Sequence, residues 1–197
     1  MARQFVVIGC HGSGVEAIAG VMHLLGVRSG NLPFAVLNTR ILRDAGGSWD
    51  KPPHWNAIDM VGDHDDAMER LVNKRDASGD VWGWADPQTC LTMSKWAPFL
   101  SAPTFLWVSR STRAIMAEMN ARHGIDAAQS RTLMSRYLAD AGLFLAGEHN
   151  GRLVCMNYDQ MRDDPIEQVD VLSWWLRVEP RATQKADAVA YIGGLDA

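Results

Sequence analysis

The chain has 197 residues, of which 47% are hydrophobic and 21% charged, with a formal net charge of −4 at pH 7. This composition is typical of a globular domain, and the length predicts one domain over residues 1–197 with a sizeable core. The negative charge excludes a general attraction to nucleic acid or to an anionic membrane. No apolar run approaches the ~20 residues that cross a bilayer, and the first strand follows the N-terminus too closely for a signal peptide, which predicts a cytoplasmic protein.

The N-terminal stretch predicts a strand, a turn and a helix in succession. Residues 5–8 are a short apolar run typical of a strand buried on both faces of a parallel sheet. Glycine then recurs within a few residues, at Gly9, Gly12 and Gly14. Helical spacing follows at Val15, Ile18, Ala19, Met22 and Leu25, before Gly26.

This glycine turn (residues 9–14) is a candidate anion site. Its backbone N–H groups can converge on a ligand without obstruction by Cβ atoms, and the positive end of a helix dipole lies behind it. The alternative is a tight βα turn without a ligand. The turn is not a Walker loop, because Gly14 is followed by Val15 and Glu16 rather than by lysine and a hydroxyl residue. This argues against ATP or GTP hydrolysis and leaves a nucleoside-phosphate kinase a distant possibility.

The rest of the chain alternates strands with helices. Strands are predicted at residues 81–84, 104–109 and 153–157, and residues 28–38 are read as a short strand or loop. Residues 48–55 are expected to form an ordered loop packed by aromatic rings. Helices are predicted at residues 38–45, 65–75, 89–96, 112–123, 127–146 and 165–176. The expected fold is a three-layer α/β fold, with a mainly parallel sheet flanked by helices on both faces.

Ligands of such sheets bind at the carboxyl ends of the strands. This rule places the glycine turn, residues 85–87 and residues 109–110 in one candidate site. Cys10, Cys90 and Cys155 are far apart and lack the spacing of paired zinc ligands, so reduced thiols and no metal site are expected.

In this order, the segments resemble the sulfotransferase family, P-loop-like enzymes that use 3′-phosphoadenosine 5′-phosphosulfate (PAPS). The first loop of bacterial members is similar to Gly9, His11, Ser13 and Gly14, with Leu-Gly-Val at residues 25–27. Residues 46–53 and 84–89 are similar to two further family segments. Arg110 resembles the strand-end arginine that grips the 3′-phosphate, and residues 157–159 resemble the family's Tyr-Glu-Asp motif.

The differences from the family fall on charged and hydroxyl-bearing positions. Gly12 replaces the loop cation that stabilises the sulfuryl group, and Ala85 and Gln88 replace basic residues of the third motif. Val15 and Glu16 occupy hydroxyl positions, and Glu118 stands where a serine is expected eight residues after Arg110. Losing the loop cation is expected to cost on the order of 100-fold or more in rate.

The resemblance implies PAPS as co-substrate without a metal, and a hydroxyl or amine of a small molecule or glycan as acceptor. The positions expected to hold the nucleotide are Gly9, Cys10, His11, Gly12, Ser13, Gly14, Val15 and Arg110. The expected catalytic residues are His11, in place of the missing cation, and His54, with His64 as the alternative general base. The cation could also come from Arg40, Arg43 or Lys51.

Each of these residues can also have a purely structural role. His11 is equally a cap of the turn, whereas for His54 and His64 the favoured alternative is that one or both are surface loop residues. Asp86 either orients a loop or a catalytic base, or it belongs to a structural turn. Of Trp49, Trp55, Trp82 and Trp84, one or two are expected to contact a ligand and the others to fill the core. The alternative function is a non-catalytic relative that binds a nucleotide, an anion or a protein partner.

Overall fold

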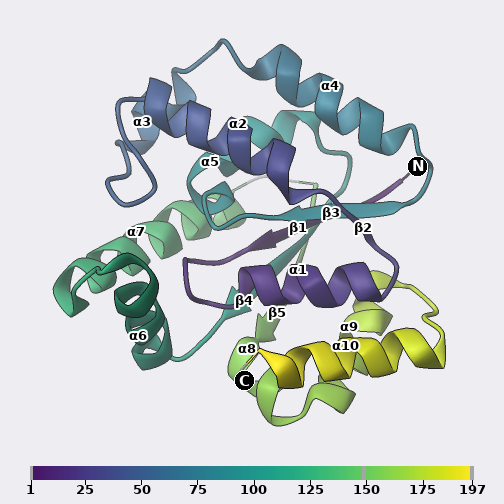
Figure 1. The fold of residues 1–197 in the computed structure, drawn as a ribbon. Helices are drawn as coiled ribbons and strands as arrows, with labels where there is room; N and C mark the ends of the chain where they lie inside the picture. Colours follow the sequence, from purple (N-terminus) through teal and green to yellow (C-terminus); the bar gives the residue numbers. More distant parts are fainter. Residues whose placement is uncertain (1, 148–149, 196–197) are drawn as a thin grey trace.

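The computed structural model of the protein describes residues 2–147 and 150–195. Among these residues, one parallel sheet of five strands forms the centre (Figure 1). Its strands are β1 (Arg3–Ile8), β2 (Arg28–Ser29), β3 (Val81–Ala85), β4 (Thr104–Ser109) and β5 (Arg152–Asn157). Their order across the sheet is β2-β3-β1-β4-β5, and each neighbouring pair is parallel. The predicted parallel α/β fold is therefore confirmed.

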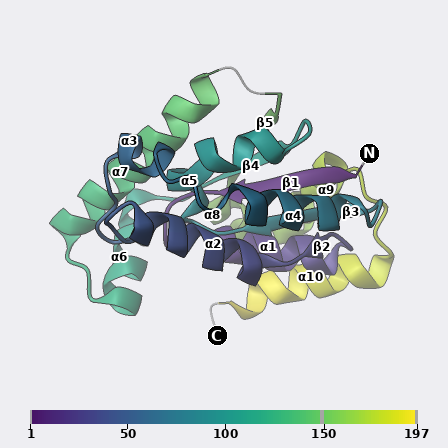
Figure 2. The ribbon, with the colours of Figure 1, turned by 90° about the horizontal axis from the view of Figure 1, so that it is seen from above.

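Helices cover both faces of the sheet, as parallel crossover connections require (Figures 1 and 2). One face carries α2 (Asn31–Asp44), α3 (Trp55–Asp59), α4 (Asp65–Asp76), α5 (Thr89–Trp96), the short η1 (Ala97–Phe99) and α7 (Ala127–Ala146). The other carries α1 (Val15–Leu24), α8 (Tyr158–Asp163), α9 (Pro165–Leu176) and α10 (Ala182–Gly194). α6 (Thr112–His123) packs against α7 near the carboxyl ends of the strands. None of the helices within the described ranges is long and apolar enough to cross a membrane.

Residues 28–38 differ from the sequence prediction. They form the two-residue β2 and then the first half of α2, which begins at Asn31 rather than near residue 38. Pro33 lies in the first turn of this helix, where the missing N–H of proline has no helical partner to lose. Phe34 and Leu37 continue the buried stripe of Ile41 and Leu42, so the apolar run belongs to one long helix.

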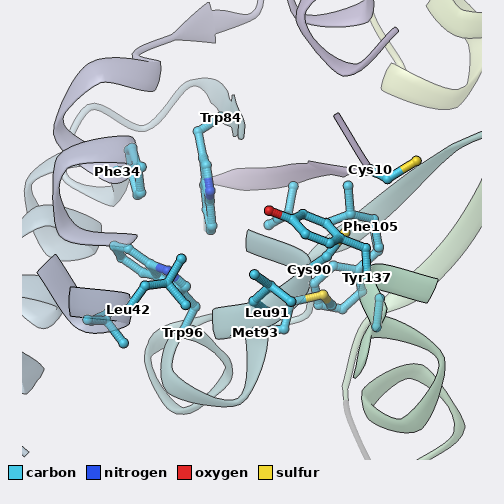
Figure 3. Packing of buried hydrophobic residues seen from close by; sticks show 14 of the residues in the cluster. Cys10, Phe34, Leu42, Trp84, Cys90, Leu91, Met93, Trp96, Phe105 and Tyr137 are labelled. Carbon is cyan, nitrogen blue, oxygen red and sulfur yellow. The ribbon is translucent and has the colours of Figure 1, made fainter. Parts of the chain in front are cut away.

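The two faces of the sheet have different cores. On the face of α2 and α5, Phe34 stacks on Trp84 with ring centroids 4.3 Å apart, and Trp96 packs beside them (Figure 3). Trp82 and Trp84 are 0% and 1% exposed, so both are core residues. The opposite face is filled mainly by aliphatic side chains of β1, α1 and α9.

β1 holds the central place in the sheet. It lies between β3 and β4, and every residue after Arg3 is buried. After β1 the chain forms α1 on one face of the sheet, whereas after the neighbouring β3 it forms α5 on the other face. The carboxyl end of β1 is therefore a crevice of the kind in which open α/β sheets bind ligands.

Candidate functional site

The glycine turn joins β1 to α1, and its shape requires glycine. Gly12 and Gly14 have φ angles of +79° and +98°, which other residues rarely adopt. A Cβ atom at Gly14 would lie 2.4 Å from the ring of Tyr158. The turn is closed by a hydrogen bond from the Ser13 N–H to the Cys10 carbonyl (3.0 Å).

The N-terminus of α1 opens onto a hollow at the carboxyl edge of the sheet. Gly14 is the N-cap residue and supplies no side-chain cap, and the Ile18 N–H is bonded to the Gly14 carbonyl at 3.0 Å. The N–H groups of residues 14–17 precede that bond and, together with the helix dipole, favour an anion. The hollow has a volume of about 130 Å³, and residues of the turn, α1, α6 and the end of β4 line it.

Arg110 follows β4 directly and faces this hollow. Its Nη1 donates to the Gly12 carbonyl at 3.1 Å and to Glu118 Oε2 at 3.0 Å. Its Nε lies 3.3 Å from Asp159 Oδ1, and the guanidinium lies 5.2 Å from the centre of the Tyr158 ring. The side chain is only 12% exposed. Arg110 is therefore fixed beside the glycine turn, and two carboxylates already bind it.

A second arginine extends this ion-pair network. Arg122 lies one helical turn after Glu118 in α6, and its Nε lies 2.8 Å from Glu118 Oε1. Its Nη1 also lies 3.3 Å from Glu16 Oε2, at the first turn of α1. Burial alone would raise the pKa of Asp159, but hydrogen bonds from Ser111 and Arg110 lower it below its usual value. Asp159 is therefore a carboxylate at neutral pH.

His11 lies within the turn but is neutral. Its ring packs against Trp49 at 4.4 Å and Tyr137 at 5.6 Å, measured between centroids. Burial, with a smaller contribution from His123, lowers the pKa of His11 to about 4. Its Nε2 is buried and has no hydrogen-bond partner among the described residues. At pH 7 this imidazole carries no charge that could replace the missing loop cation.

The other cations considered from the sequence lie elsewhere. Arg40, Arg43 and Lys51 are exposed, and in the described parts of the chain none of them lines the hollow. Burial raises the pKa of Cys10 to about 11, so this neighbour of the turn is a neutral thiol.

The histidines expected as general bases are not at the turn. His54 is the N-cap of α3, where its Nδ1 accepts a hydrogen bond from the Asn56 N–H. It precedes Trp55, which lines a separate hollow of about 260 Å³ together with Leu91 and Leu143. His64 Nε2 lies 2.8 Å from Asp44 Oδ2. His123, the last residue of α6, was not among the residues predicted from the sequence, yet it lines the hollow beside the turn.

Asp86 follows β3 but points into the core. Its Oδ2 accepts a hydrogen bond from Asn38 Nδ2 at 2.7 Å, and burial raises its pKa. The Asn38 Oδ1 accepts hydrogen bonds from Trp96 Nε1 and Thr92 Oγ1, both at 2.7 Å. In the sequence, this network is indicated only by Asn38, a polar residue on the apolar face of the helix predicted at residues 38–45. Of the predicted group at this edge, Pro87 and Arg110 share the hollow with the turn.

Comparisons with known proteins support the fold. No protein-family model matches the sequence, and no curated protein matches it significantly. The structure is similar to that of sulfotransferase STF9 from Mycobacterium avium, with a TM-score of 0.63 and 12% identity over 98% of this chain and 68% of that one. It is also similar to an unliganded sugar kinase from Janibacter sp. HTCC2649, with a TM-score of 0.56 and 18% identity over 91% of this chain and 97% of that one. The chain thus has a P-loop-like α/β fold.

Proposed function

We propose that this protein binds the phosphosulfate end of an adenine nucleotide at the glycine turn and transfers its sulfuryl group to an acceptor. PAPS is the donor that the sequence resemblance implies, and the acceptor is a hydroxyl or amine of a small molecule or glycan. The observation that carries the proposal is the uncapped N-terminus of α1, which faces Arg110 across the hollow. The structural likeness to a sulfotransferase supports the same reading.

Sulfuryl transfer requires different contributions from the residues that line the hollow. A bond forms between the acceptor oxygen and sulfur, the bond from sulfur to the 5′-phosphate breaks, and the acceptor proton leaves to a base. The N–H groups at the start of α1 are suited to the charge that develops on the leaving phosphate. His123 is exposed and lines the hollow, so it can take the proton directly or through one water.

Calorimetry with adenosine 5′-monophosphate and with adenosine 3′,5′-bisphosphate tests the binding step. At least one of them should bind, and Gly12→Val should abolish that binding, because Gly12 has a left-handed φ and its Cβ would lie 3.2 Å from the Ile115 carbonyl. Gly46→Val is the matched control, since Gly46 also has a positive φ but nothing within 4 Å of its Cβ position. If neither nucleotide binds at millimolar concentration, the proposal is wrong.

Transfer of labelled sulfuryl groups to a panel of hydroxyl acceptors tests the catalytic step. Replacing a general base typically costs roughly 100-fold or more, so His123→Gln should lower the rate by that factor. His54→Gln is the parallel variant, because His54 was the base expected from the sequence and lies outside the hollow. A loss with His54→Gln and none with His123→Gln would place the acceptor beside His54 rather than beside His123.

A specific observation favours a second function, binding without catalysis. Both arginines that line the hollow are paired with carboxylates, and His11 is neutral. The described lining residues thus include no arginine or lysine that is free of a carboxylate and available for the sulfuryl group. Nucleotide binding that Gly12→Val abolishes, without transfer to any acceptor, would identify the protein as such a relative.

A further inference from the structure

Glu118 occupies the place between the two arginines of the hollow. Its Oε2 lies 3.0 Å from Arg110 Nη1, and its Oε1 lies 2.8 Å from Arg122 Nε. The two carboxylate oxygens are thus each held by a guanidinium, as two oxygens of a bound phosphate would be. A Cβ at Gly12 would lie 3.3 Å from the Glu118 Cβ, so this side chain also packs against the glycine turn.

The charges around this place disfavour a second anion. Arg110 and Arg122 face the carboxylates of Glu16, Glu118 and Asp159, so the network carries a surplus of one negative charge. Arg110 Nη1 donates hydrogen bonds to the Gly12 carbonyl and to Glu118, and its Nε donates one to Asp159. A phosphate dianion here would either displace a carboxylate or bind the remaining guanidinium donors close to all three carboxylates, and both arrangements are unfavourable. The hollow therefore offers one anion position, at the N-terminus of α1.

A carboxylate that lines a ligand site accepts hydrogen bonds from hydroxyl groups. Glu118 has about four lone-pair positions, of which the two arginines use two, and its side chain is 26% exposed. The same chemistry distinguishes dinucleotides in α/β folds, where an acidic residue binds a free ribose hydroxyl and an arginine accommodates a phosphate at that position. In this protein the acidic residue, Glu118, already forms ion pairs with Arg110 and Arg122.

We infer that Glu118 selects a ligand with one phosphate or phosphosulfate end and free hydroxyls next to it, and rejects one with a second phosphate. This inference rests on the proposed function, since it assumes that the glycine turn binds the 5′-phosphate. It makes the 3′-hydroxyl form of the phosphosulfate nucleotide, rather than PAPS, the preferred donor. A sugar phosphate has the same combination of groups.

Calorimetry with adenosine 5′-monophosphate, adenosine 3′,5′-bisphosphate and glucose 6-phosphate tests the inference. The wild type should bind the monophosphate at least tenfold more tightly than the bisphosphate. Glu118→Ser should reverse this order, because it releases Arg110 and Arg122 for the second phosphate. Tighter binding of the monophosphate than of glucose 6-phosphate identifies the hydroxylated part as a nucleoside. Binding of glucose 6-phosphate alone would overturn the proposed function.

Glu16→Gln is the matched control. It removes one negative charge from the same network, but among the described residues Glu16 forms an ion pair with Arg122 alone, and it is 70% exposed. It should change the affinities for the two adenosine nucleotides by similar factors and preserve their order. Thermal melts check that each variant is folded, which is expected because Arg110 keeps its ion pair with Asp159 in Glu118→Ser and the pair lost in Glu16→Gln is exposed.

Four outcomes would overturn the inference. A wild type that binds the monophosphate less than tenfold more tightly than the bisphosphate contradicts it, and so does a Glu118→Ser variant that keeps the wild-type order; both leave the proposed function intact. Binding of none of the three ligands by either protein, or binding that Gly12→Val does not weaken, would overturn the proposed function and the inference together.

Discussion

Asp86 and Arg110 stand at equivalent places in the sheet and have opposite surroundings. Each is the first residue after a strand, β3 for Asp86 and β4 for Arg110. Asp86 is 5% exposed and bonded to Asn38, behind Trp84 and Trp96. Arg110 lies beside a hollow, with two carboxylates that solvent reaches.

This difference separates a structural polar cluster from an exchangeable one. In the Asn38 cluster (Asn38, Asp86, Thr89, Thr92 and Trp96), buried donors and acceptors are paired with each other, so any change leaves a group unsatisfied. In the Arg110 network (Arg110, Arg122, Glu16, Glu118 and Asp159), a ligand or water can replace a lost partner. The sheet edge brings both clusters to the carboxyl ends of strands, and burial decides which of them is available for binding.

The largest expected effect comes from breaking the buried cluster. Asn38→Leu leaves Asp86 Oδ2 and the Trp96 N–H without their partners and removes one of the two hydrogen bonds of Thr92, and each group left unsatisfied costs about 1–3 kcal/mol. The free energy of unfolding should fall by about 5 kcal/mol, measured by urea denaturation. Thr39→Ala, on the exposed face of the same helix, should change it by less than about 0.5 kcal/mol. Similar losses for the two variants would contradict the role of the cluster.

A side chain at Gly14 should have the next largest effect. Gly14→Ala combines a φ of +98° with a Cβ placed 2.4 Å from the Tyr158 ring, so unfolding should become easier by about 4 kcal/mol. Gly46→Ala isolates the backbone cost, since its φ is +84° and nothing lies within 4 Å. It should cost only about 1 kcal/mol. Equal losses, measured in urea, would show that Tyr158 yields to the new side chain.

Acid should weaken the fold through His11. Its pKa is about 4 in the folded protein and 6.5 ordinarily, so the unfolded chain binds more protons between these values. The His11 contribution is complete above pH 6.5 and is lost as the pH falls towards 4, by up to about 3 kcal/mol. The raised pKa of Asp86 acts in the opposite direction. The wild type is therefore compared with His11→Phe, which keeps an aromatic ring but cannot be protonated. This variant should flatten the curve of unfolding free energy against pH between pH 4 and 6.5. Parallel curves for the two proteins would contradict the assignment.

The smallest effect is expected at the rim of the hollow. Arg122 is 60% exposed, and its ion pairs with Glu16 and Glu118 are screened by salt. Arg122→Gln should therefore cost less than about 1 kcal/mol of stability, and less still in 1 M salt. Thermal melts at low and high salt measure both values. A loss as large as that of Asn38→Leu would make this network structural as well.

Local patterns in the sequence predicted much of the fold. The apolar run at residues 5–8 and the glycines after it specified β1, the turn and α1, because they determine backbone conformation over a few residues. The strands near residues 81–84, 104–109 and 153–157 were also correct. The extent of α2 was wrong, since Leu32 and Val36 are exposed and obscure the helical stripe.

The sequence by itself determined a parallel α/β fold with a glycine turn at the end of its first strand, because spacing and glycine content act locally. The tertiary structure decided what the side chains around that turn do. Glu118 was visible as an unusual residue eight positions after Arg110, but only the packing of α6 against the turn places its carboxylate between Arg110 and Arg122. The charge of His11 likewise depends on Trp49 and Tyr137, which are distant in sequence and exclude water from its ring. Burial and pairing arise from contacts between distant segments, so no local pattern encodes them.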